Sequence, residues 1–119
     1  MNEERRLSPR IRAYRPVRLQ RPNSHEPIQT LTKDIGGNGL RCVISDVVPV
    51  STELSVELIL SDGEQPLVTR GQAMWFRMLP HSDQFDLGIS FIDQSPQNKR
   101  RLSVYLERLS SKLSSDPTK

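Results

Sequence analysis

Six short runs in which apolar and polar residues alternate constrain the fold more than any other feature of this 119-residue chain. In residues 52–60, Leu54, Val56, Leu58 and Leu60 fall at every second position. A strand with one buried face and one solvated face produces this pattern, because successive side chains point to opposite faces. The other five runs are residues 16–21, 28–35, 40–45, 67–79 and 85–93. Turn-forming residues separate the runs and no helical period interrupts them, so we predict an antiparallel barrel or sandwich.

The end of the chain has a different period. Ser95 followed by Pro96 is typical of a helix start, with an N-cap serine and a proline at the first helical position. The apolar residues that follow at helical spacing are Leu102, Tyr105, Leu106, Leu109 and Leu113. We therefore predict a C-terminal amphipathic helix that packs against the barrel or against a partner.

Two glycine positions carry specific structural expectations. The stretch DIGGNG, residues 34–39, lies between two strand-like runs, and Asn38-Gly39 predicts a hairpin whose two turn residues both have positive φ. Gly71 lies inside the long run of residues 67–79, where a glycine predicts a bulge or a bend.

Positive charge is concentrated at the N-terminus. Residues 1–21 hold seven arginines against Glu3 and Glu4, a net charge of +5, whereas the other residues carry −2 and the whole chain +3. Such a basic arm favours a partner that bears phosphate groups. A solvated tail without a specific role is the alternative that charge alone leaves open.

The sequence does not favour catalysis or metal binding. GGNGLR lacks the lysine and hydroxyl of a nucleotide-binding loop, and no nucleophile elbow is present. His25 and His81 lie in loop-like stretches without a second metal ligand at suitable spacing, so we expect surface histidines, no metal and no cofactor. Cys42 lies in a strand-like run and is expected to be a small core residue.

A single cysteine excludes an internal disulfide and favours a reducing compartment, so we expect a cytoplasmic protein. No apolar run is long enough to span a membrane, and the start MNEERR is too polar for a signal peptide.

Several motifs, taken in order, resemble a PilZ domain over nearly the whole chain. RRLSPR contains an R-x-x-x-R element formed by Arg6 and Arg10, with Arg5 before it, and DIGGNG is close to a [D/N]-x-S-x-x-G element. AMW (residues 73–75) and DLGISFI (residues 86–92) follow, and the predicted helix closes the chain. The resemblance implies a mainly β fold, a six-stranded antiparallel barrel with a C-terminal helix. It also implies binding of the bacterial second messenger cyclic di-GMP, with the arm wrapping over the ligand.

In these terms, residues 1–15 form a flexible basic arm, residues 16–114 the barrel and helix, and residues 115–119 a disordered tail. The ligand-binding set that the resemblance implies is Arg5, Arg6, Arg10, Asp34, Gly36, Gly37, Gly39 and Trp75. Arginine forks suit phosphates and the O6/N7 edge of guanine, and a carboxylate suits guanine N–H donors. Glycines let the backbone approach the ligand and direct N–H groups at an anion. Trp75 either packs beside a guanine or fills the barrel core.

The chain departs from the family pattern at Gly36, where the family has serine. Loss of that hydroxyl removes one hydrogen bond, worth roughly 0.5–1.5 kcal/mol, or up to ~3 kcal/mol if its partner is charged. We expect weakened but retained binding.

Two other functions remain open. The chain is either a PilZ-like interaction module without ligand binding or an OB-like nucleic-acid binder. The second is disfavoured because aromatic residues make up only 5% of the chain and positive charge gathers in the arm. We expect a non-enzymatic receptor, monomeric or weakly dimeric, that signals to a separate protein and binds neither membrane nor nucleic acid.

Overall fold

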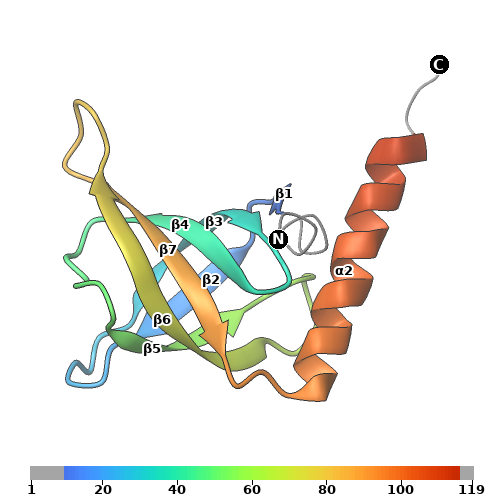
Figure 1. Ribbon diagram of the computed structural model, residues 1–119, viewed down its shortest axis with the longest axis horizontal. Helices are drawn as coiled ribbons and strands as arrows, with labels where there is room; N and C mark the ends of the chain where they lie inside the picture. The colour runs from blue at the N-terminus through green and yellow to red at the C-terminus, as the bar shows by residue number, and fades with distance from the viewer. Residues whose placement is uncertain (1–9, 116–119) are drawn as a thin grey trace, which may run out of the picture.

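The computed structural model describes residues 10–115, with side chains through residue 111. Its strands are β1 (Ile11–Arg12), β2 (Pro16–Gln20), β3 (Ile28–Ile35), β4 (Gly39–Ile44), β5 (Glu53–Leu58), β6 (Leu67–Met78) and β7 (Phe85–Ile92), and its helix is α2 (Pro96–Ser115). Strands β2 to β7 form a closed antiparallel barrel in the order β3-β2-β5-β6-β7-β4, and β4 pairs again with β3 to close it (Figure 1). The predicted barrel and its strand positions are confirmed.

Strand β1 was not predicted. It pairs Ile11 with Ile35 and Arg12 with Asp34, on the side of β3 that β2 occupies further along. Two residues are too few to show an alternating pattern, so no sequence period marks this strand. It lies in the segment expected to be an arm, and residues 1–9, with Arg5 and Arg6, lie outside the described residues.

The barrel core follows the predicted alternation. Leu54, Val56, Leu58 and Leu60 are all buried, as expected. Cys42 is buried too, which confirms it as a core residue. Burial, with a smaller contribution from the negative charge of Asp86, raises the pKa of the Cys42 thiol from 9.0 to about 12. The thiol is therefore protonated and unreactive in the folded chain.

The hairpin between β3 and β4 exists, but its predicted turn conformation is wrong. Asn38 and Gly39 do not have positive φ. The Gly36 N–H donates to the Gly39 carbonyl at 2.8 Å, and Ile35 pairs with Leu40. Gly39 is required for another reason: a Cβ there would lie 2.1 Å from the Ile89 carbonyl oxygen of β7. The glycine permits close approach of two strands, not a left-handed turn.

The predicted irregularity in β6 is also displaced. Gly71 keeps regular pairing with Leu54 and Phe91, and the register shifts between Ala73 and Trp75. A Cβ on Gly71 would lie 2.6 Å from Ile89 Cγ2, so this glycine makes room inside the barrel. The shift has a consequence for Trp75. Regular alternation after buried Ala73 would point Trp75 inward, but the extra residue turns it to the outer face.

Helix α2 begins where the sequence predicts. The Asn98 N–H donates to Ser95 Oγ at 3.1 Å, the expected N-cap contact. Leu102 is buried, and Tyr105, Leu106 and Leu109 pack against the core, which confirms packing on the barrel. The helix lies beside the barrel, in contact with β6 and β1 (Figure 1). The Leu113 side chain lies outside the described part.

Candidate functional site

Asp34 lies near the end of β3, between β1 and β4. Its Oδ1 accepts a hydrogen bond from Arg10 Nη1 at 2.8 Å, and its Oδ2 lies 2.9 Å from Arg41 Nε. The carboxylate is only 15% exposed. Two arginines from different segments therefore hold the Asp34 carboxylate.

Arg41 was missed by the sequence reasoning. Its Nε is an ion-pair partner of Asp34, but the N–H is not aligned for a hydrogen bond and remains buried without an acceptor. The expected two-residue turn at Asn38-Gly39 would place Arg41 across from Gly36. The observed register places it across from Asp34 as an opposite-charge cross-strand pair, so the sequence prediction gave no signal for this contact.

One row of residues crosses the outer face of four strands. Asp34 of β3 pairs with Arg41 of β4, Arg41 pairs with Gly88 of β7, and Gly88 pairs with Trp75 of β6. A Cβ on Gly88 would lie 2.3 Å from Trp75 Cε2, so the indole occupies the space over the glycine. The Arg77 guanidinium lies 5.2 Å from the Trp75 ring centroid, within cation–π range. Trp75 therefore lies half-buried on the outer face and is not a core residue.

A second carboxylate, Asp86, anchors the same face. Its side chain is 4% exposed, and Lys33 Nζ lies 3.3 Å from Oδ1, while Arg41 Nη1 and Arg77 Nη2 lie 3.9 and 3.8 Å from Oδ2. A carboxylate buried this deeply is tolerated because cations compensate it. The charged residues that these ion pairs join are Arg10, Lys33, Arg41 and Arg77 with Asp34 and Asp86. The net charge of +2 favours an anion.

The glycines of residues 36–39 are anchored to the fold. Gly36 is buried and its N–H is engaged in the turn, so it does not face an anion as we expected. The Gly37 carbonyl accepts a hydrogen bond from Gln94 Nε2 at 3.0 Å, and the Asn38 carbonyl accepts one from the Phe91 N–H at 2.8 Å. Of the predicted site residues, the structure thus brings Arg10, Asp34 and Trp75 to one face, with the glycine loop at its edge.

Metal sites and membrane-spanning helices were also sought in the described part of the chain. Within residues 10–115, no cluster of three or more His, Cys, Asp or Glu residues could hold a metal ion. His25 and His81 are exposed, as predicted. No helix in this range has the length and hydropathy to cross a membrane.

Comparison with known proteins identifies relatives of the whole barrel and helix. The sequence profile described as "PilZ domain" matches residues 4–108. No curated protein is significantly similar in sequence. The Bacillus subtilis inhibitor of motility MotI/DgrA superposes with a TM-score of 0.74 at 19% identity, covering 93% of this chain and 52% of that one.

Two structures from Escherichia coli are also similar. YcgR in complex with c-di-GMP gives a TM-score of 0.77 at 14% identity, over 92% of this chain and 48% of that one. The PilZ domain of YcgR with c-di-GMP gives a TM-score of 0.69 at 14% identity, covering 95% of this chain and 99% of that one. The chain spans about half the length of MotI and YcgR and nearly all of the separate domain. At these identities the likeness establishes a common fold.

Proposed function

Since the chain belongs to the PilZ domain family, we propose that it is a receptor for cyclic di-GMP that passes the binding event to a partner protein. The solved structures of two similar proteins, YcgR and Klebsiella MrkH, are complexes with this ligand. We place the receptor in the cytoplasm, because a lone reduced cysteine is typical of that compartment.

The observation that carries the proposal is the gathering of Arg10, Asp34 and Arg41 on one face beside Trp75. Cyclic di-GMP presents two phosphodiester anions and two guanines. Arg10 and Arg41 supply cations for phosphate oxygens or guanine acceptors, and Asp34 is an acceptor for guanine N–H groups. Trp75 offers a flat surface against which a guanine can pack. Arg5 and Arg6 join this set from the preceding part of the arm, and Gly36, Gly37 and Gly39 form its edge.

The same geometry supports a change of conformation on binding. Arg10 and Asp34 bind each other at 2.8 Å, although both are proposed ligand contacts. The ligand has to separate them, and the cost is small because Arg10 is 46% exposed and exposed pairs contribute about 0.2–1 kcal/mol. Binding therefore replaces the contact of Arg10 with Asp34 by a contact of Arg10 with the ligand, and it changes the surface beside β1.

Calorimetric titration of arginine variants tests this site. Arg10→Ala should weaken cyclic di-GMP binding by about 2 kcal/mol, or about 30-fold, because a charge-assisted contact is lost. Arg18→Ala is the matched control, since Arg18 is an exposed arginine on β2 away from the Asp34 row. Equal losses at both positions would mean that the arm attracts the ligand only through diffuse charge.

A second titration separates the other functions. Single-stranded DNA at two salt concentrations serves as the comparison ligand. Binding of DNA with a steep salt dependence, and no preference for cyclic di-GMP, favours a nucleic-acid binder. No binding of either ligand favours a PilZ-like module that acts through proteins alone.

A further inference from the structure

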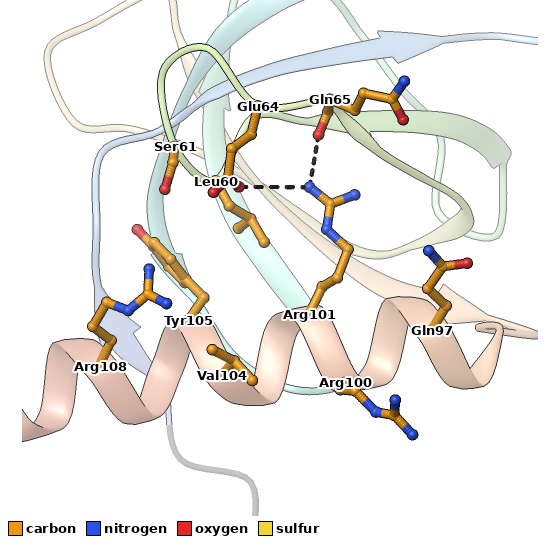
Figure 2. Close-up of a pocket in the computed structure, with 10 residues that line it drawn as sticks. All are labelled: Leu60, Ser61, Glu64, Gln65, Gln97, Arg100, Arg101, Val104, Tyr105 and Arg108. Atoms are coloured by element: carbon orange, nitrogen blue, oxygen red, sulfur yellow. Dashed lines mark hydrogen bonds and ion pairs between the residues drawn. The ribbon is translucent and has the colours of Figure 1, made fainter.

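A groove runs between α2 and the loop of residues 59–66 (Figure 2). Its lining contains no residue of the Asp34 row. Its larger hollow has a volume of about 510 Å³ and lies between Leu60 of the loop and Val104 and Tyr105 of the helix. A smaller hollow of about 320 Å³ shares Leu60, Tyr105 and Arg108 with it and continues to Arg15 and Leu109. We call these two hollows together the helix groove.

The walls of the helix groove are tied together at both ends. Arg101 donates from Nη2 to the Gln65 carbonyl at 2.6 Å, which binds the loop to the helix. At the other end, Arg15 donates from Nε to the Ile59 carbonyl at 2.8 Å and from Nη2 to Asp62 at 2.9 Å. The groove is therefore preformed, and an occupant does not have to order its walls.

The charges of the groove are only partly compensated. Arg15 pairs with Asp62, and Arg101 lies 3.8 Å from Glu64. Arg100 and Arg108, which also line the groove, form no ion pair with any residue in the described part of the chain. In Figure 2, Arg108 extends toward the loop beside Tyr105, whereas the Arg100 side chain points away from the loop. A mixed lining, in which Val104 and Tyr105 lie among cations that lack ion pairs, suits an acidic ligand that also carries an apolar group.

The dimensions of the groove favour an extended peptide. It follows the helix from Gln97 to Leu109, about 18 Å at ~1.5 Å per residue. At ~3.3 Å per residue this length holds about five extended residues. A second copy of the chain suits it poorly, because a symmetric contact would bring Arg100 and Arg108 of both copies together.

The groove is also connected to the Asp34 row. Strand β1 pairs with β3 at Asp34 and contacts α2. Arg15, three residues after β1, holds the loop that forms the opposite wall. A change in how Arg10 is anchored therefore acts on the segment that closes the groove.

We propose that the helix groove binds an acidic, partly apolar peptide segment of a partner protein, and that it is the output surface of the receptor. The output role rests on the proposed function, whereas peptide docking stands independently of it. The apolar residues of the segment lie on Val104 and Tyr105, and its carboxylates face Arg108.

Two synthetic hexapeptides test the docking. One alternates glutamate with leucine, and the other has glutamine in place of each glutamate. In a titration followed by amide NMR shifts of the full chain, the acidic peptide should shift amides of residues 60–65 and 100–109 and bind about tenfold more tightly than the neutral one. Arg108→Glu should weaken binding about tenfold or more. Lys99→Glu, the same charge change on the same helix outside the groove, should leave it nearly unchanged.

Other outcomes overturn the proposal in distinct ways. Equal losses in Arg108→Glu and Lys99→Glu would show diffuse attraction, and equal binding of both peptides would remove the role of charge. Shifts of the groove amides with protein concentration alone would identify a second copy as the occupant.

Adding saturating cyclic di-GMP should change the affinity for the acidic peptide, and unchanged affinity with ligand bound would refute the output role. Absence of cyclic di-GMP binding in calorimetry would refute the proposed function while leaving peptide docking in place.

Discussion

Replacing Gly39 with alanine should destabilise the barrel, although the residue lies in a loop-proximal motif expected to serve the ligand. The added Cβ would lie 2.1 Å from the Ile89 carbonyl oxygen, 3.1 Å from its carbon and 3.2 Å from Ser90 Cα. All three are backbone atoms, so no side chain can rotate away. Carbon–oxygen contacts are normally at least ~3.3 Å, so β4 and β7 have to separate locally by about 1 Å.

The magnitude follows from this displacement. Overpacking in a well-packed region costs about 1–3 kcal/mol, and a clash with backbone lies at the upper end. We expect a loss of about 3 kcal/mol, which lowers the melting temperature by roughly 10 °C in a domain of this size. Denaturant unfolding, followed by circular dichroism and by the fluorescence of the single tryptophan, Trp75, measures the free energy of unfolding, and thermal unfolding measures the melting temperature.

Gly37→Ala is the matched control within the same motif. A Cβ on Gly37 meets nothing within 4 Å, and its φ is not positive. Alanine there restricts the unfolded chain without strain, so we expect a gain of about 0.4–1 kcal/mol. If Gly39→Ala unfolds like the parent protein and loses only ligand binding, the structural role assigned to this glycine is refuted.

Two further predictions concern buried groups. The Cys42 thiol has a pKa near 12 in the folded chain against 9.0 when exposed, so the unfolded state releases its proton first. The stability that this group contributes is complete below pH 9 and falls as pH rises towards 12. Relative to Cys42→Ala, the free energy of unfolding should fall by about 1.4 kcal/mol per pH unit in this range, measured by the same denaturant titration. Identical pH profiles of the two proteins would contradict this burial effect. Gly88→Ala should displace the Trp75 indole by its Cβ clash and shift the tryptophan emission to the red, whereas Ser90→Ala, on the same strand, should not. An unchanged spectrum in Gly88→Ala would show that the indole does not lie over the glycine.

Much of the fold was predictable because the alternating pattern depends only on residues that are close in sequence. The strand of residues 53–58 and the Ser95 cap each depend on neighbours within a few positions. The two errors arose where long-range packing decides the backbone. Gly39 and Gly71 are glycines because Ile89 of another strand approaches them, and no local turn or bulge preference reveals that approach.

The candidate site was predictable only in part. Arg10 and Asp34 belong to motifs that the sequence shows directly, and the structure joins them. Arg41 and Asp86 lie in strand-like runs where alternation marks them only as outward-facing residues. Their ion pairs depend on which strands become neighbours, and that follows from closure of the barrel. The outward position of Trp75 depends on a single register shift, between Ala73 and Trp75, that no residue in this part of the sequence indicates.

The closure of the barrel also limits how the protein can associate. Each of β2 to β7 has a hydrogen-bonded strand on both sides, so their backbone groups are not available to a foreign strand. A partner cannot extend this sheet along these strands by β-augmentation, and misfolded copies find no long edge on them to seed aggregation. Recognition has to proceed through side chains on the barrel surface and the helix. A surface substitution can therefore retune the choice of partner without disturbing the backbone ladder that positions the Asp34 row.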